Sequence, residues 1–421
     1  MSELSLANPP LELRMRLSAM RKWIVVAAGT VAMMAGFGVT TTVALLVKPF
    51  EIESGWLRAD IAFAYTLLSA GAALGGLVAG LASDRLDSRP ITVFGTIAMG
   101  AGLVAIAWQS DLWAIQIIYL AIGVFGFACV YTPVLATVGL WFDKGRGLAM
   151  GIVTAGGSLG QGVMPAIMQP LIETYGWRMA FVAVGLGLVL LIAPLMLLVA
   201  KPERIAEAPR GSAQAAGWPM PPAIGIAWLS LAGLFCCASM AVPLVHLVAL
   251  LTDRGLSGAQ TASLILVVML SASLGRIAFG LFADRYGVLT AYALAVLGQT
   301  LTVYWFVPLS SLAWLWGLAA LFGFGFGGVM TTLLLCARAA APARMSGLAT
   351  SLVTLFAWVG MGLGGYEGGH CFDITGTYAV SFAGAALAGV LNLLVLGGLV
   401  LHLRSYRLGA HHVRVSPAAA G

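Results

Sequence analysis

The sequence predicts an all-α membrane protein, with twelve transmembrane helices in two pseudo-symmetric six-helix halves. Of its 421 residues, 60% are hydrophobic and 9% are charged, whereas a soluble domain carries about 25% charged residues. Several runs contain no Asp, Glu, Lys or Arg and match or exceed the roughly 20 residues that cross the hydrocarbon layer as a helix; they are 23–47, 61–83, 112–142, 147–172, 179–200 and 345–366. In addition, a twelve-residue segment recurs in similar form 200 residues later.

Charged or polar turns set the limits of each expected span. In the first half, the spans are expected at 22–47, 58–82, 90–110, 112–139, 147–172 and 177–200. In the second half, they are expected at 223–251, 257–283, 288–307, 311–337, 345–366 and 377–403. The stretch 286–337 is free of charge and long enough for two spans, and Pro308-Leu309-Ser310-Ser311 marks the break between them.

A polar segment joins the two halves. Residues 201–222 (KPERIAEAPRGSAQAAGWPMPP) carry charge, proline and glycine, as is typical of an aqueous linker. The chain therefore divides into an N-terminal tail, two halves, a linker and a C-terminal tail, at 1–21, 22–200, 201–222, 223–403 and 404–421. The five cysteines lie in or beside apolar segments, and their spacing is not that of a zinc or redox site. No metal and no cofactor is expected.

The basic residues orient the chain. With the N-terminus inside, 17 of the 22 Lys and Arg residues fall on the cytoplasmic side, and only Lys48, Arg58, Arg178 and Arg254 fall outside. This bias is typical of inner or plasma membrane proteins with cytoplasmic termini. The net charge of +6 therefore reflects orientation in the lipid bilayer, and no nucleic-acid partner is expected.

The two halves share a sequence plan. LGGLVAGLASDR at 74–85 matches LGRIAFGLFADR at 274–285. Two parallel repeats of six helices predict a substrate site near the membrane midplane where the halves meet, with alternating access by rocking of one half against the other.

These segments also carry a family resemblance. Gly80-x-x-x-Asp84-Arg85-x-x-x-Arg89 resembles the signature loop of the major facilitator superfamily, although Asp87 replaces a usual glycine, and Asp284-Arg285 belongs to a weaker second copy. The resemblance implies the major facilitator fold and a gate role for these residues. A solvated turn with orientation charges is the alternative.

Within that superfamily, the chain resembles the monocarboxylate transporters and their bacterial relatives, including the oxalate–formate exchangers. The supporting stretches are WFDKGRGLAMGI (141–152), GWRMAF (176–181) and the arginine of the eighth span, Arg276. This resemblance implies a carrier of small carboxylates.

Arg276 is the only ionisable residue between 257 and 283. Eight residues of helix place it about 12 Å from Asp284. A cation within a span normally faces the bundle interior and marks a pathway, although a long arginine can also snorkel toward the interface. No acid lies one turn away, since position 272 is alanine and position 280 is glycine. A planar guanidinium suits bidentate capture of a carboxylate, so we predict that Arg276 anchors an anionic substrate.

The resemblance supports this role and departs from it in detail. In the monocarboxylate transporters, the arginine at the position of Arg276 contacts the substrate. An aspartate often stands four residues earlier, where this chain has Ala272, and the best match to a lysine of their first span is Thr41. The exchangers use a lysine in the eleventh span, and 345–366 contains none. Binding of a single carboxylate is therefore what the resemblance implies.

Other residues complete the expected site. His246 is the only ionisable residue between 223 and 252 and could exchange a proton near neutral pH or contact substrate; a neutral histidine bonded between helices is the alternative. Glu367 is a second candidate for proton coupling, or lies in an interfacial loop. Tyr131 could donate its hydroxyl to the substrate, and Phe356 and Trp358 could shape the apolar side of the pocket, although all three could simply pack between helices.

We therefore expect a secondary active transporter that moves a small monocarboxylate together with protons, and that acts as a monomer. An anion exchanger of the oxalate–formate type and a multidrug efflux carrier are the alternatives, and a substrate-sensing receptor without flux is a third. An enzyme is not expected, because no nucleophile–base pair, metal-ligand cluster or phosphate-binding loop stands in a polar setting.

Overall fold

The computed structural model describes residues 11–142, 146–200, 218–342 and 345–415, and all regular secondary structure in these ranges is helical. The first half contains α1 (Leu11–Ser54), α2 (Arg58–Arg85), α3 (Ser88–Ala107), α4 (Leu112–Ala121), η1 (Ile122–Phe127), α5 (Ala128–Trp141), α6 (Arg146–Gly187), η2 (Leu188–Ile192), α7 (Ala193–Leu195) and η3 (Met196–Leu198). The second half contains α8 (Pro222–Asp253), α9 (Gly258–Tyr286), α10 (Val288–Val303), η4 (Tyr304–Phe306), α11 (Leu312–Ala340), α12 (Ser346–Thr375) and α13 (Ala379–Val415).

Eleven helices of the described chain are long and apolar enough to cross a membrane. One of them, Ala149–Leu198, has 50 residues and contains two of the predicted spans. Its backbone breaks at Gly176, where φ is 80° and ψ is 160°, a conformation that glycine adopts without steric cost. The break lies between the spans predicted at 147–172 and 177–200, so this helix supplies two crossings and the predicted total of twelve is confirmed.

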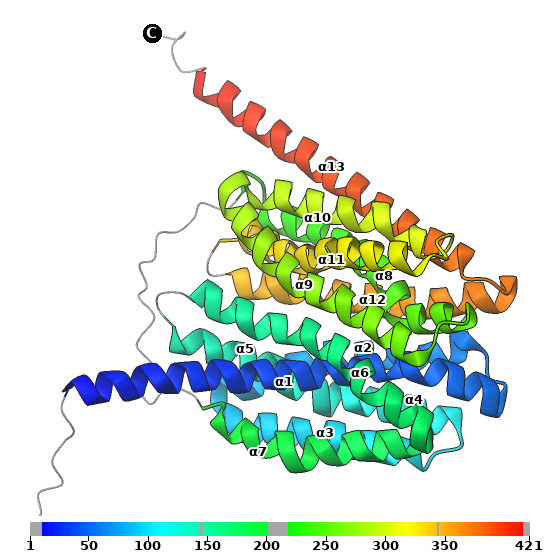
Figure 1. Ribbon diagram of the computed structural model, residues 1–421. Coiled ribbons are helices and arrows are strands. Elements are labelled where there is room, and N and C mark those ends of the chain that lie inside the picture. Colours follow the sequence, from blue (N-terminus) through cyan, green and yellow to red (C-terminus); the bar gives the residue numbers. More distant parts are fainter. Residues whose placement is uncertain (1–10, 143–145, 201–217, 343–344, 416–421) are drawn as a thin grey trace, which may run out of the picture.

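The helices form two groups that follow the chain. Figure 1 shows α1 to α7 on one side of the molecule and α8 to α13 on the other, with the start of α1 and the end of α13 projecting at the same end. Both helices extend into the predicted tails, and residues 201–217 of the predicted linker lie outside the described residues. We call the end that holds the chain termini the inner end, and the opposite one the outer end, following the charge bias of the sequence.

The most extensive contacts between the two halves are those of α2 with α12, α6 with α9 and α1 with α8. Glycines bring the backbones together at these contacts. A Cβ on Gly162 of α6 would lie 2.8 Å from the Cβ of Met269 on α9, and a Cβ on Gly369 of α12 would lie 2.7 Å from the backbone nitrogen of Ala59 on α2. Real Cβ atoms do not approach this closely, so the packing of the halves requires small residues at these positions.

The contact between α6 and α9 ends before the inner end of these helices. On α6, residues 162, 155 and 151 follow one helix face. The Ser273 hydroxyl of α9 still reaches the carbonyl oxygen of Ala155 at 3.4 Å. One turn further in on α6, a Cβ on Gly151 would meet no atom of the described chain within 4 Å, and neither would a Cβ on Gly280, two turns further in on α9. The halves are therefore packed together at the outer end and separated at the inner end.

Candidate functional site

Arg276 lies on the face of α9 that is directed at the other half. The side chain of Met269 meets α6 at Gly162, and that of Ser273 meets it at Ala155. Arg276 follows Ser273 by three residues, which places the two on the same helix face. Behind it, a Cβ on Gly275 would lie 2.1 Å from the carbonyl oxygen of Phe324, so α9 and α11 touch through their backbones. The guanidinium therefore points toward the space where the halves separate.

Arg276 forms no ion pair with an acidic side chain of the described residues. Its Nε is buried and has no hydrogen-bond partner among the described residues. The ion pairs found in the described part of the chain join other residues. Because a buried charge is normally paired and hydrogen-bonded, this side chain has the chemistry of a site that takes its counter-ion from outside the protein.

Tyr131 lies at the same depth as Arg276 in the opposite half. It follows the outer start of its span at Leu112 by 19 residues, and Arg276 follows the outer start of α9 by 18, so both lie about 27–29 Å from the outer helix ends at 1.5 Å per residue. The charge of Arg276 acts on the Tyr131 hydroxyl. The structure therefore brings together the two residues that the sequence predicts as carboxylate anchor and hydroxyl donor.

An aromatic cluster begins at Tyr131 and extends one helical turn toward the outer end. Tyr131 stacks on Phe127 with ring centroids 5.5 Å apart, Phe37 of α1 meets both rings edge-on, and Trp358 of α12 reaches Phe127 from the other half at 5.3 Å. Phe127 ends the π-helical segment η1, an element found frequently at functional sites. We call these four residues the aromatic cluster; it joins the halves above Arg276.

Thr41 and Phe356 are two further residues that the sequence predicts for the substrate site. Thr41 is buried in α1, and its hydroxyl donates to the Phe37 carbonyl oxygen at 3.2 Å. Phe356 of α12 is 41% exposed, whereas Trp358, two residues on, makes the contact with the aromatic cluster. No described contact joins Thr41 or Phe356 to Arg276, and their assignment to the substrate site stays a prediction.

His246 is not beside Arg276. It lies seven residues before the outer end of α8, about 10 Å deep, and its side chain is fully buried. Its Nε2 lies 2.8 Å from the Gly365 carbonyl oxygen and its Nδ1 lies 3.3 Å from the Tyr378 hydroxyl. Both ring nitrogens therefore have partners, and the ring belongs to the outer end of the molecule.

Glu367 also lies near the outer end, between α12 and α13. Its carboxylate accepts a hydrogen bond from the Cys371 thiol at 3.3 Å, and a Cβ on Gly384 of α13 would lie 2.4 Å from Oε1. Neighbouring Gly368 instead faces the His246 ring. Glu367 thus lies away from His246 and from Arg276, and its role in proton coupling stays a prediction.

The signature-loop residues lie at the inner end. A Cβ on Gly80 would lie 3.6 Å from the Thr132 side chain in the same half, and the side chains of Asp84 and Arg85 lie outside the described residues. Arg89 is exposed, with its Nε 3.7 Å from the Asp87 carboxylate. Asp284 and Arg285 are exposed as well. These positions are consistent with an inner end at which the halves are apart.

A group of charges at the outer end was not predicted from the sequence. Arg58, at the start of α2, is 2% exposed. Its guanidinium donates to Glu51 at 2.8–3.1 Å, to Asp253 at 2.7 and 3.2 Å and to the Tyr378 hydroxyl at 2.8 Å, and it lies 3.7 Å from the ring centroid of Phe372. The available signal was that charges stand at the outer helix ends in both halves, but a sequence does not reveal which of them pair.

The other outer cations are bonded too. Lys48 pairs with Glu51 and Asp253, and Arg178 pairs with Glu53 at 2.9 Å. Arg254, in the turn after α8, donates to the carbonyl oxygens of Phe306 and Leu309 at 2.7 and 2.9 Å. Partial burial lowers the pKa of this guanidinium, but arginine stays protonated in proteins. All four cations on the outer side therefore have structural partners.

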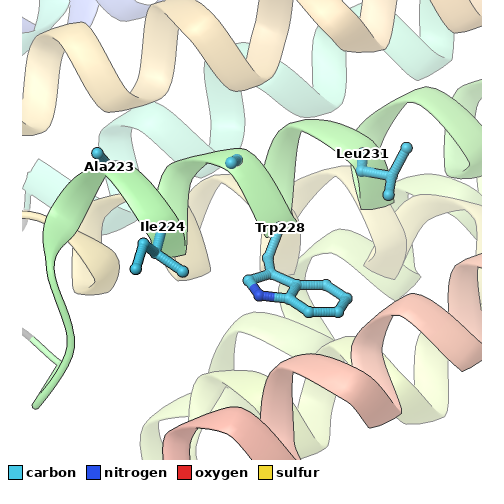
Figure 2. Close-up of a pocket in the computed structure, with 5 residues that line it drawn as sticks. Ala223, Ile224, Trp228 and Leu231 are labelled. Atoms are coloured by element: carbon cyan, nitrogen blue, oxygen red, sulfur yellow. The ribbon is translucent and has the colours of Figure 1, made fainter.

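A surface pocket of about 430 Å³ lies along α8 and is lined by Ala223, Ile224, Ala227, Trp228 and Leu231. Figure 2 shows these side chains on one stretch of α8, near its inner end. The lining is apolar, and the Trp228 indole donates to His402 of α13 at 3.2 Å. The pocket contains none of the predicted site residues.

Comparisons with known proteins agree with this architecture. The family profile described as Major Facilitator Superfamily matches residues 25–365. Human monocarboxylate transporter 11 is 27% identical over 391 residues, which cover 85% of this chain and 79% of the relative. The fujikurins efflux protein of Gibberella fujikuroi is 29% identical over 268 residues, covering 61% and 55%. The solved structure of the nucleoside transporter NupG superposes with a TM-score of 0.69 at 12% identity, covering 89% of this chain and 99% of that one.

Proposed function

The chain belongs to the Major Facilitator Superfamily, a family of transporters rather than enzymes, and from this premise we propose that it carries a small monocarboxylate together with protons across the inner or plasma membrane. Its termini lie in the cytoplasm in this proposal, following the charge bias of the sequence. A single chain supplies both sides of the site, with Tyr131 from one half and Arg276 from the other, so the carrier acts as a monomer.

The observation that carries the proposal is that Arg276 forms no ion pair with an acid of the described residues. It lies within a span and faces the gap between the halves, and its Nε has no partner among the described residues. Two parallel N–H groups of a guanidinium match the two oxygens of a carboxylate. Relatives named monocarboxylate transporters over most of the chain support this substrate class.

Tyr131 and the other residues of the aromatic cluster would hold the rest of the substrate. The Tyr131 hydroxyl lies within the field of Arg276 and can donate a hydrogen bond to a carboxylate or hydroxyl oxygen. Phe127 and Trp358, which meet across the halves at 5.3 Å, offer an apolar surface on the outer side. A bound carboxylate neutralises the guanidinium, and the loaded site then crosses a low-dielectric constriction more easily than a lone charge would.

Proton coupling belongs to the same proposal. His246 and Glu367 are titratable groups within spans, and histidine changes its charge near neutral pH. Because both lie near the outer helix ends, protonation in this proposal acts at a distance from the bound carboxylate. Uptake that follows an imposed pH gradient would support the coupling.

The test is uptake of labelled monocarboxylates into proteoliposomes by Arg276→Lys and Arg276→Gln variants. We expect Arg276→Gln to lose saturable uptake and Arg276→Lys to keep a weaker uptake, because lysine retains the charge without the bidentate geometry. Arg178→Gln is the matched control, since Arg178 is an exposed arginine whose Glu53 partner lies in the same half.

The alternatives predict different results. A multidrug efflux carrier would keep its export after Arg276→Gln and would move neutral compounds. An exchanger of the oxalate–formate type would require a counter-anion inside the vesicles. Unchanged carboxylate uptake by the Arg276→Gln variant would overturn the assignment of Arg276 as the anchor.

A further inference from the structure

The charges at the outer end form a network that joins the two halves. Lys48, Glu51 and Arg58 come from the first half, and Asp253 and Asp373 come from the second. We propose that these five residues form the outer gate of the carrier, and that His246, through Tyr378, holds the gate closed only while its ring is neutral. The gate concerns closure of the outer end and does not depend on which substrate is carried.

The ion pairs cross between the halves at Asp253. Its two carboxylate oxygens accept from Nη1 and Nη2 of Arg58 at 2.7 and 3.2 Å, and Lys48 pairs with the same carboxylate. Glu51 holds Arg58 from within the first half, at 2.8–3.1 Å. When the outer end opens, Glu51 can stay with Arg58, whereas Asp253 must leave both cations.

Asp373 adds a second link of a different kind. Its Oδ1 accepts from the backbone N–H of Arg58 at 3.0 Å, and its Oδ2 accepts from that of Ala59 at 2.8 Å. These are the first two amides of α2, which have no acceptor within their own helix. A carboxylate from α12 thus caps a helix of the other half, beside the close contact of Gly369 with Ala59.

His246 connects to this gate through one hydroxyl. The Gly365 carbonyl oxygen can only accept, so Nε2 of His246 carries the hydrogen and Nδ1 is the acceptor. The Tyr378 hydroxyl donates to this Nδ1 at 3.3 Å and accepts from Nη1 of Arg58 at 2.8 Å. In this series of hydrogen bonds from Arg58 through Tyr378 to His246, every donor has an acceptor only while the His246 ring is neutral.

Protonation of His246 would disturb the closed gate in two ways. Nδ1 would become a donor, so the Tyr378 hydroxyl would lose its acceptor and face two cationic donors. A second positive charge would also stand behind Arg58. Arg58 on α2 is linked to the ring through Tyr378, and Asp253 on α8 and Asp373 on α12 bond to Arg58, while Glu367 of α12 lies against α13.

Residue 66 offers a position at which to observe the gate. The Thr66 hydroxyl of α2 donates to the Gly362 carbonyl oxygen of α12 at 2.7 Å, eight residues or about 12 Å below Arg58. A cysteine placed there is covered while the outer end is closed. Its labelling by a membrane-impermeant thiol reagent, applied from the outside of oriented vesicles, reports opening.

The experiment measures labelling of Thr66→Cys at about pH 7.5 and about pH 5.5, where histidine changes charge. Rates are divided by those of an exposed control, Ser54→Cys, and the parent without either cysteine gives the background from native thiols. We expect acid to raise the normalised rate about fivefold or more. Adding His246→Gln should abolish this rise, and adding Asp253→Asn should give fast labelling at both pH values.

Glu53→Gln is the matched control, because Glu53 pairs with Arg178 and Trp177 within one half, and it should leave labelling unchanged. Slow labelling of the Asp253→Asn variant, or equal effects of Asp253→Asn and Glu53→Gln, would overturn the gate. An acid response that survives His246→Gln would assign the response to the carboxylates and overturn the role of His246. If His246→Gln does not fold, Tyr378→Phe removes the hydroxyl that links Arg58 to His246 and should also reduce the acid response.

Discussion

Removal of the Asp373 carboxylate tests the link between α12 and α2 most directly. In the closed structure this side chain accepts from two backbone amides of α2. Loss of a helix cap costs about 0.5–2 kcal/mol, and a hydrogen bond to a charged group contributes about 1.5–3 kcal/mol. Because Asp373 is half-buried, we expect Asp373→Ala to lose about 1–2 kcal/mol for its two hydrogen bonds together. That free energy corresponds to a factor of about 5–30 in an equilibrium.

Hydrogen–deuterium exchange of the peptide that contains Arg58 and Ala59 measures this change. The two amides should exchange about 5–30 times faster in Asp373→Ala, and less so in Asp373→Asn, which keeps one acceptor oxygen. Asp111→Ala is the control, because Asp111 caps its own helix through the Trp113 amide at 3.2 Å and should leave this peptide unchanged. Exchange that does not accelerate in Asp373→Ala would refute the reasoning.

Three further changes have expected outcomes. Tyr131→Phe keeps the stack but removes the hydroxyl, so the KM for a monocarboxylate should rise about tenfold, as for a lost hydrogen bond of about 1–1.5 kcal/mol; an unchanged KM would exclude that contact. Gly162→Leu should lower the melting temperature, because its Cβ would lie 2.8 Å from Met269 and overpacking costs about 1–3 kcal/mol, whereas Gly151→Ala should not. Glu53→Gln removes an exposed ion pair and should change the free energy of unfolding by less than about 1 kcal/mol, measurable by thermal denaturation in detergent.

The fold was predictable because the bilayer imposes it. An uncharged run of sufficient length can satisfy its backbone in hydrocarbon only as a helix, so the predicted spans and the observed helices coincide. Even the break inside α6 falls between two predicted spans, at Gly176. The resemblance of 74–85 to 274–285 further indicated that the spans form two halves, which the family match confirms.

Part of the site was predictable for a related reason. Arg276 stands alone in an uncharged run, and a lone cation in a span is rare enough to predict a role. Its nearness to Tyr131 could not be read from the sequence, because it depends on how deeply two helices of different halves lie. The same limitation applies to His246, which the structure places about 10 Å from the outer end of its helix, far from the depth of Arg276.

Arg58, which is buried, and Arg276, which is half-buried with a buried Nε, have surroundings that differ in a way that bears on their roles. Arg58 is surrounded by Glu51, Asp253 and Tyr378, so its charge is balanced when the protein is empty and the outer end is closed. Arg276 has no such acid among the described residues. Removing water from a cation costs several kcal/mol unless a partner replaces it. In the proposed mechanism, the first arginine therefore stabilises one conformation of the protein, whereas the second stabilises a complex with an anion from solution, and a carrier of anions needs both.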